Sequence, residues 1–420
     1  MPRFLSGVEM DFYDLFFYLS MGGGLLMAFA LGANDVANSM ASAVGARAIT
    51  VRQAVLIAAL LNFVGAVLLG SQVTATISKG IIDPTAITDP RVMTLGMFSS
   101  LLAAGVWVLV ATLTSLPVSS THSIVGAILG FGFLVGGPEV VNWLKMGGIV
   151  MSWIISPFFA AIIGFLVFSH IRKTIFVSHD FIRQSKKWGA IWMALTCGLI
   201  MISFFYKTPF GERLDLSLGA AAAVCLVVMA AAWIVTRRGL EKLVPDPAAG
   251  AEGVEQVFRK MQIFTSCYVA LSQGANDVAN AIGPVAAVYV LAKTGMLATK
   301  AEVPIFMLVI GGLGIALGIG LLGHKVMATV GEKITTLTNT RGFAVDIGAA
   351  TTVLLASNLG LPVSTTHAAV GAVTGVGLAR GFKAVDFGVL GRIVIYWVLT
   401  VPAAAFTSVL IYRILDWIVS

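Results

Sequence analysis

The sequence predicts an all-α integral membrane protein with about 12 transmembrane segments in two repeats of inverted topology. Three observations support this fold class. Of the 420 residues, 58% are hydrophobic and 11% are charged, whereas a soluble domain carries about 25% charged residues. The apolar residues form blocks long enough to cross the hydrocarbon core, which takes about 20 helical residues. Two sequence motifs also occur twice, in the same order.

The repeats are defined by these motifs. GANDVANSMASAVGA begins at Gly32 and GANDVANAIGPVAAV at Gly274, 242 residues later. LPVSSTHSIVGAILGFG begins at Leu116 and LPVSTTHAAVGAVTGVG at Leu361, 245 residues later. Two matches at nearly one spacing indicate a duplication. We therefore expect a first repeat over residues 1–170, a second over 261–420, and a connecting region over 171–260.

The apolar segments of the first repeat and the connecting region can be placed in order. Five segments belong to the first repeat and a further pair to the connecting region: 15–48, 53–72, 92–114, 117–135 and 147–169, then 189–206 and 216–235. The second repeat begins with an apolar stretch over 261–292 and should supply five segments in all. An odd number of crossings in each copy inverts the second relative to the first, which is a transporter architecture.

The charged residues orient these segments. The net charge is +7, and the basic residues lie in short loops, where the positive-inside rule explains them better than nucleic-acid binding does. Both basic loops of 171–260 should face the cytoplasm, which places both termini outside a plasma membrane. The acidic N-terminus predicts no cleavable signal peptide. Three cysteines in apolar stretches, Cys197, Cys225 and Cys267, do not predict a disulfide framework or a metal cluster.

Two features predict interrupted helices. GANDVAN lies at the centre of apolar runs longer than one crossing requires, so we expect a break at its glycine. Pro117 and Pro362 interrupt the other long stretches just before the Ser/Thr clusters. Either two helices span the membrane there or a re-entrant hairpin enters it. We favour the hairpin, because it brings the hydroxyl groups to the depth of the aspartates.

Asp35 and Asp277 are the strongest functional signal. An ionisable group at the bilayer centre costs about 2.5–3.5 kcal/mol even on permissive scales, so two in identical contexts favour function over a protonated structural role. Asparagines flank both: Asn34, Asn38, Asn276 and Asn280. Residues three or four apart share a helix face, and amide and carboxylate oxygens are hard ligands suited to sodium. The motif predicts a cation site.

Each Ser/Thr cluster follows a proline and opens an apolar helix: Ser119, Ser120 and Thr121, and Ser364, Thr365 and Thr366. A single cluster could simply cap its helix. Two clusters near buried aspartates favour an oxyanion site, because helix N-termini present free N–H groups and a positive dipole end. Neither motif contains a lysine or arginine, so an anion could enter only together with cations.

Several other polar residues are weaker candidates. His122 and His367 follow the clusters directly and could bond between helices or carry a coupling proton. Asp346 lies in an apolar stretch where the first repeat has Leu101, and it could form an extra ion site or pair with Arg341. Gln273 and Asn62 lie in membrane segments.

Together, the paired GANDVAN and P-V-S-[ST]-T-H motifs resemble the inorganic phosphate transporter (PiT) family of sodium- or proton-coupled symporters, over nearly the whole chain. The resemblance implies a homodimer of a twelve-segment inverted-repeat fold, with phosphate bound between the repeats. The short central loop, and Asn62 near a position where animal relatives tend to be acidic, depart from the animal pattern.

The resemblance also implies the site residues and the cargo. Phosphate would contact Asp35, Asn38, Ser119, Ser120, Thr121, Asp277, Asn280, Ser364, Thr365 and Thr366. Sodium ions, as coupling ions and not as cofactors, would contact Ala33, Asn34, Asp35, Ser120, Ala275, Asn276, Asp277 and Thr365. Independently of the resemblance, the residue types and membrane positions of His122, His367, Asp346 and Gln273 make them candidates for a proton or extra ion site.

Other interpretations stay open at this point. Coupling to protons, or transport of sulfate or a metal–phosphate complex by the same fold, fits the same motifs. An intramembrane aspartyl protease would use the two aspartates as a dyad, but it leaves the asparagines and the Ser/Thr clusters without a task. The chain is therefore predicted to be a transporter and not an enzyme.

Overall fold

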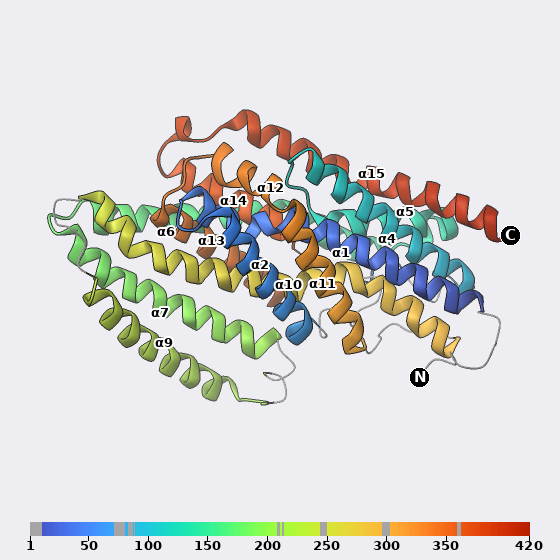
Figure 1. Cartoon of the computed structure of the whole chain (residues 1–420), viewed down its shortest axis with the longest axis horizontal. Helices are drawn as coiled ribbons and strands as arrows, with labels where there is room; N and C mark the ends of the chain where they lie inside the picture. Colours follow the sequence, from blue (N-terminus) through green and yellow to red (C-terminus); the bar gives the residue numbers. More distant parts are fainter. Residues whose placement is uncertain are drawn as a thin grey trace.

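The computed structural model describes residues 11–70, 80–82, 87, 89–207, 211, 214–243, 250–295, 303–358 and 363–420. These residues are almost entirely helical (Figure 1). Within them, β-pairing is limited to one isolated bridge between Ile82 and Val141. The prediction of an all-α protein is confirmed.

Each apolar segment predicted for the first repeat and the connecting region coincides with a helix. The first repeat contains α1 (Phe12–Gly45), α2 (Val51–Leu69), α4 (Pro90–Leu113), α5 (Ser120–Gly136) and α6 (Trp143–Ile171). The connecting region contains α7 (Phe181–Lys207) and α9 (Leu218–Glu241). The second repeat contains α10 (Ala251–Thr294), α11 (Ile305–Leu322), the short α12 (His324–Ala328), α13 (Asn339–Asn358), α14 (Thr365–Leu378) and α15 (Phe387–Val419).

The helices are suited to a bilayer. Among the described residues, nine helices are long and apolar enough to cross a membrane. On α9, Leu226, Val227 and Val235 are 65–70% exposed, as expected for side chains that face lipid. The chain is thus a multi-pass membrane protein, while the total of twelve crossings stays a prediction, as does the inversion of the repeats.

Helices of the two repeats pack against each other in reciprocal pairs. Helix α1 packs against α10 and α11, and α10 packs in turn against α2. Likewise α5 packs against α15, and α14 against α6. The paired α7 and α9 lie at one edge of the molecule (Figure 1). The GANDVAN segments of α1 and α10 therefore lie at the centre of the fold.

The predicted breaks at the GANDVAN glycines are wrong, because α1 and α10 continue through both motifs. The glycines allow close helix crossings. A methyl group on Gly32 would overlap the backbone carbonyl of Ile315 in α11, and one on Gly274 would overlap that of Asn62 in α2. Small residues commonly allow membrane helices to approach backbone to backbone.

The chain does turn between α4 and α5, at residues 114–119. This turn contacts Asn34 of α1 through Leu116 and Val118. Asn34 lies eleven residues before the end of α1, or about 16 Å at 1.5 Å per residue. The tip of the α4–α5 hairpin therefore lies level with Asn34, well short of the end of α1, which supports a re-entrant hairpin. In the second copy, Leu361 and Pro362 lie outside the described residues, and α14 begins directly after Ser364.

Candidate functional site

The centre of the site is the carboxylate of Asp35, which is 1% exposed on α1. Its Oδ2 accepts a hydrogen bond of 2.6 Å from Ser120 Oγ at the start of α5. Its Oδ1 accepts from Thr366 Oγ1 at 3.3 Å and from Asn38 Nδ2 at 3.4 Å. No lysine or arginine of the described residues pairs with it. Asp35 thus brings the Ser/Thr clusters of both repeats together through neutral donors alone.

Two asparagines connect the repeats reciprocally. Asn38 of α1 donates to Thr366 Oγ1 at 3.0 Å and to Thr365 Oγ1 at 3.2 Å, both in the second repeat. Asn280 of α10 donates to Thr121 Oγ1 of the first repeat at 3.4 Å. Each GANDVAN motif therefore contacts the hairpin of the other copy, which sequence spacing alone could not reveal.

Asn34 and Asn276 occupy equivalent positions but have different surroundings. Asn34 is 1% exposed and donates to Thr112 Oγ1 at 3.0 Å and to the Leu116 carbonyl at 3.1 Å. It also accepts from the Val118 amide at 3.1 Å. Asn276 is only half-buried and donates to the Ser272 carbonyl of its own helix at 3.1 Å. The first-repeat half of the site is closed over its asparagine, and the second-repeat half is not.

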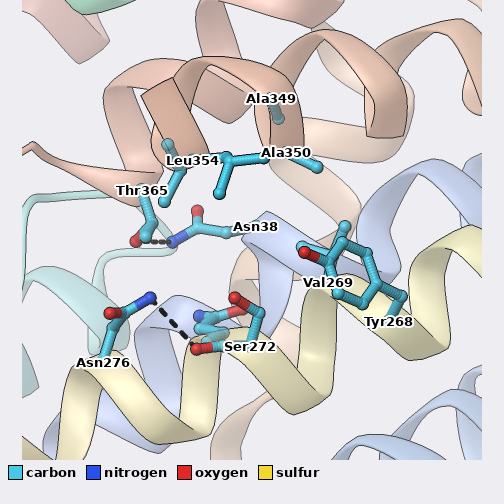
Figure 2. A pocket seen from close by; sticks show the side chains of 11 residues that line it. Asn38, Tyr268, Val269, Ser272, Asn276, Ala349, Ala350, Leu354 and Thr365 are labelled. Atoms are coloured by element: carbon cyan, nitrogen blue, oxygen red, sulfur yellow. Dashed lines mark hydrogen bonds between the residues drawn. The ribbon is translucent and has the colours of Figure 1, made fainter. Parts of the chain in front are cut away.

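A small cleft adjoins the second-repeat half. It lies between α10, α13 and Asn38 (Figure 2), and its lining includes Asn276, Thr365, Gln273 and Ala350. Its volume is about 30 Å³, which is enough to hold water. The cleft gives Asn276 and Thr365 their partial exposure.

The other predicted ion ligands lie on the same two helices. Gln273 donates a short hydrogen bond to the backbone carbonyl of Asp35. Ala33, Ala275 and Asp277 are buried beside the asparagines, and Asp277 is 3% exposed. Buried carboxylate and carbonyl oxygens of this kind suit a hard cation such as sodium.

Ser119 and Ser364 have a different role from their neighbours. Each precedes the first residue of a helix, and its hydroxyl accepts from a backbone amide, that of His122 or His367, at 3.2 Å. These are N-caps, which satisfy otherwise free N–H groups. Ser120, Thr365 and Thr366 are the cluster members that contact Asp35 or Asn38.

His122 and His367 lie against each other, with ring centroids 4.4 Å apart. His122 packs on Trp153 at 3.6 Å, and His367 stacks on Trp397 at 3.7 Å. His367 Nδ1 lies 3.0 Å from the Trp153 carbonyl, so this nitrogen carries the proton when the ring is neutral. The ring contacts of the histidines join the two repeats, and the ring hydrogen bond of His367 is to Trp153 and not to Asp35.

Asp346 forms a second polar cluster, which the sequence only hinted at. Its Oδ1 accepts from Ser42 Oγ at 2.6 Å, and its Oδ2 accepts from Thr265 Oγ1 and Ser266 Oγ at 2.7 Å each. Arg341 bonds elsewhere, so the predicted alternative of an Asp346–Arg341 pair is not observed. The sequence feature that could have identified Ser42 is its position seven residues after Asp35, which places both residues on the same helix face.

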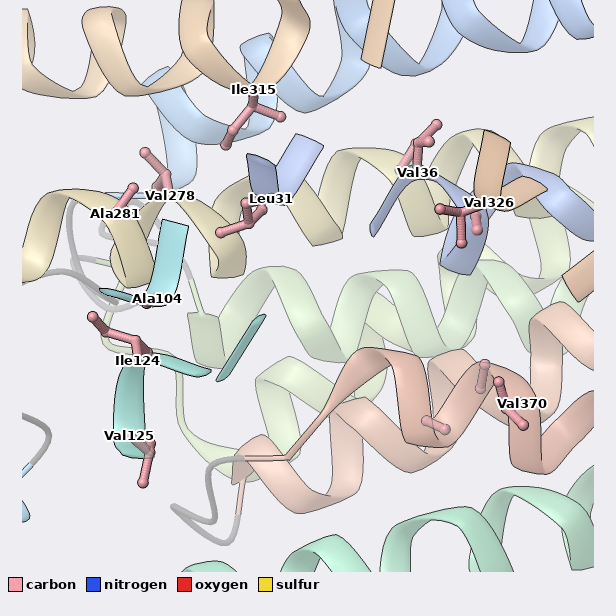
Figure 3. Packing of buried hydrophobic residues seen from close by; sticks show 14 of the residues in the cluster. Leu31, Val36, Ala104, Ile124, Val125, Val278, Ala281, Ile315, Val326 and Val370 are labelled. Carbon is pink, nitrogen blue, oxygen red and sulfur yellow. The ribbon is translucent and has the colours of Figure 1, made fainter. Parts of the chain in front are cut away.

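Apolar side chains enclose these polar clusters. Leu31 and Val36 lie beside the motif on α1, Val278 on α10 and Ile315 on α11, all at most 1% exposed (Figure 3). Such packing excludes water and strengthens each electrostatic interaction inside. Asn62 is buried as well, but it donates to the Ala58 carbonyl of its own helix at 2.9 Å.

Known proteins with similar sequences agree with this architecture. The model of the phosphate transporter family (PHO4) matches residues 31–408. A Pyrococcus abyssi protein named putative phosphate permease is 51% identical over 97% of this chain and 99% of its own length. The chloroplastic inorganic phosphate transporter 2-1 of Arabidopsis thaliana is 38% identical over 94% of this chain and 71% of its own length.

A solved structure also matches. The chain is similar to a protein described as the sodium-dependent phosphate transporter, with a TM-score of 0.89 and 47% sequence identity over 96% of this chain and 100% of the other. The family match spans both GANDVAN motifs and both Ser/Thr clusters. The chain therefore belongs to the phosphate transporter family.

Proposed function

We propose that this protein imports inorganic phosphate by symport with sodium ions. The observation that carries the proposal is the set of neutral donors around Asp35: Ser120, Thr366 and Asn38. Membership of a phosphate transporter family supports phosphate as the cargo. The name of the similar solved structure supports sodium as the coupling ion.

Electrostatics supplies the coupling. Phosphate carries one to two negative charges at neutral pH, and Asp35 and Asp277 would add to them. Like charges in a low-dielectric interior repel by several kcal/mol, and no arginine or lysine of the described residues pairs with Asp35 to offset this. Sodium ions must bind first or together with phosphate, so neither species crosses efficiently without the other.

The roles divide between the helices and the hairpins. Phosphate contacts Asp35 and Asp277, Asn38 and Asn280, and the clusters Ser119–Thr121 and Ser364–Thr366. Their hydroxyls and the N-terminal amides of α5 and α14 donate to its oxygens. Sodium ions bind to side-chain and backbone oxygens of Ala33, Asn34, Asp35, Ser120, Ala275, Asn276, Asp277 and Thr365.

Asp346 is an additional sodium site in this scheme. Its carboxylate gathers three hydroxyl groups, from Ser42, Thr265 and Ser266, and each hydroxyl oxygen retains a lone pair for a cation. Gln273 holds the α1 backbone at the main site. His122 and His367 hold the hairpins together and carry no coupling proton.

The proposed setting is a plasma membrane, with both termini outside. The two repeats have inverted topology within twelve crossings, and the reciprocal packing of α1 with α11 and α10 with α2 supports this. The family resemblance implies a homodimer, and we include this oligomeric state in the proposal.

The alternatives make different use of the same residues. Proton coupling would assign a titrating role to Asp35, Asp346 or the histidines, and a metal–phosphate complex would replace sodium by a divalent ion. Sulfate has no proton to donate, so an acceptor such as Asp35 favours phosphate over it. A protease dyad would leave Asn38 and Asn280 without a role.

Purified protein in liposomes tests the proposal. Uptake of labelled phosphate is measured under an inward sodium gradient, then under a potassium gradient at constant pH. We expect uptake only with sodium, and at least a tenfold loss in Asp35→Asn and in Asp277→Asn. Uptake that follows an inward proton gradient and ignores sodium would overturn sodium coupling. No uptake of phosphate under either gradient would overturn the cargo.

A further inference from the structure

Three arginines line a cleft that shares no residue with the site around Asp35. The cleft lies between the end of α6, α10 and the ends of α13 and α14. Its volume is about 260 Å³, and it is lined by Phe168, Arg172, Phe176, Glu255, Thr340, Arg341 and Arg380. The volume equals that of several water molecules at about 30 Å³ each, which is enough for a phosphate group.

Two of the arginines are held close together. Arg341 Nη1 donates to the Thr336 carbonyl at 3.1 Å, and Arg380 Nη1 donates to the same oxygen at 3.3 Å. Arg380 also donates to Thr336 Oγ1 at 2.9 Å. Both guanidinium groups stay charged at any physiological pH, and the Thr336 carbonyl and the Glu255 carboxylate offset their mutual repulsion only in part.

The protein supplies little negative charge to the cleft. Arg172 Nη1 donates to the Ala379 carbonyl at 2.9 Å, and none of the three arginines forms an ion pair within the described residues. The one carboxylate in the lining, Glu255, accepts from the Thr340 amide at 2.8 Å and from its hydroxyl at 2.7 Å. Arg341 Nε is buried without a hydrogen-bond partner among the described residues.

The other walls of the cleft are aromatic. The guanidinium of Arg341 lies 5.8 Å from the ring centroid of Phe168, and Phe176 also lines the cleft. On α6, one turn earlier, Phe165 and Leu166 are 41% and 58% exposed. The cleft therefore lies where the apolar surface of α6 meets the basic segment that begins at Arg172.

We propose that this cleft is a second anion site, separate from the transport site, that binds a phosphate group through Arg172, Arg341 and Arg380. Arginine forks match phosphate oxygens in pairs, and basic clefts between membrane helices bind lipid head groups. The group belongs either to an anionic phospholipid or to free inorganic phosphate. Because Arg172 comes directly after α6 of the first repeat and the other two from the second repeat, the bound group joins the repeats.

The lipid arm of the test uses full-length protein in nanodiscs of phosphatidylcholine, with and without about 30% phosphatidylglycerol as the anionic lipid. The measured quantity is the rise in Tm caused by the anionic lipid. We expect most of this rise to disappear in Arg341→Gln/Arg380→Gln and in Arg172→Gln. Arg238→Gln removes the same charge from an exposed position on α9 and should keep it. Comparing lipids within one variant cancels any folding defect.

The free-phosphate arm uses phosphatidylcholine nanodiscs and protein carrying Asp35→Asn and Asp277→Asn, which disables the transport site. Titration with inorganic phosphate should then show a residual binding event that Arg341→Gln/Arg380→Gln weakens at least tenfold. If the cleft variants lose the response to anionic lipid alone, the phosphate group belongs to a phospholipid. If they lose the binding of inorganic phosphate alone, it is free phosphate. Equal responses of the cleft variants and the Arg238→Gln control in both arms would overturn the proposal.

Discussion

Ser120 donates a 2.6 Å hydrogen bond from its Oγ to Asp35 Oδ2, and this bond joins the start of α5 to the middle of α1. One residue earlier, Ser119 accepts from the His122 amide and caps the helix. Two adjacent hydroxyls of one cluster therefore have different partners, which allows their contributions to be separated by experiment.

Ser120→Ala should weaken sodium binding, because it removes a hydroxyl oxygen of the proposed sodium site and a hydrogen-bond donor to Asp35. A loss of about 1.4 kcal/mol in binding corresponds to tenfold in affinity. We expect the sodium concentration for half-maximal phosphate uptake to rise about tenfold. Ser119→Ala should instead lower stability by about 1 kcal/mol as a lost N-cap and weaken phosphate binding, with a smaller rise in the half-maximal sodium concentration than in Ser120→Ala. Equal sodium dependence in both variants would contradict the assignment.

Asp346→Asn should alter sodium dependence without abolishing phosphate binding. The cluster of Asp346 with Ser42, Thr265 and Ser266 does not include Asp35, so loss of its charge leaves the main site intact. We expect a lower Hill coefficient for sodium in the uptake assay, with phosphate still transported. A wild-type Hill coefficient together with wild-type uptake would show that Asp346 holds no coupling ion.

Gly32→Ala and Gly274→Ala should both destabilise the fold. The new methyl group would overlap the carbonyl of Ile315 or Asn62, and overpacking of this kind costs about 1–3 kcal/mol. Thermal unfolding in detergent measures the loss. Gly22 and Gly283 lie on the same two helices with open space around them, so their alanine variants are the controls and should keep or raise Tm.

The two halves of the site should differ in accessibility. Ala350 lines the cleft beside Asn276, while Ala104, next to the equivalent position in α4, is fully buried. In a background with the three native cysteines replaced by serine, Ala350→Cys should react with a small thiol reagent at least tenfold faster than Ala104→Cys. Sodium plus phosphate should slow the reaction. Equal rates would contradict the asymmetry.

His122→Asn and His367→Asn should lower stability and leave ion coupling intact. Each ring stacks on a tryptophan, and the two rings contact each other, so truncation removes packing between the repeats. The readouts are Tm and the pH profile of sodium-driven uptake. We expect a lower Tm with an unchanged profile. A profile that becomes flat in either variant would assign a coupling proton to that histidine.

The fold was largely predictable because a bilayer imposes strong constraints on a sequence. Blocks of apolar residues and two repeated motifs were enough to place α1, α2, α4, α5 and α6. The helix break at GANDVAN was predicted wrongly because glycine has two uses in membranes. It can interrupt a helix or admit a neighbouring backbone, and only the position of Ile315 or Asn62 distinguishes the two.

The sequence was enough to predict which residues form the site, but not which of them bond to each other. Duplicated polar residues at membrane depth identified Asp35, Asn38 and the Ser/Thr clusters. That Asn38 bonds Thr366 and Asn280 bonds Thr121 depends on how the repeats pack, which spacing does not encode. The hydroxyls of Thr265 and Ser266 escaped notice because isolated hydroxyls are common in membrane helices and cost little there.

The glycine crossings also determine which regions of the protein can move. Helices separated by side chains can slide past each other as the side chains change rotamer. At Gly32 and Gly274 the backbones are in direct contact, with no side chain between them to adjust. We therefore expect α1 to move together with α11, and α10 together with α2. Glycines also bring α5 against the backbone of α15 at Gly126 and Gly130, and α14 against that of α6 at Gly371 and Gly375. Opening of the transport path should therefore occur between these glycine-joined pairs of helices and not within them.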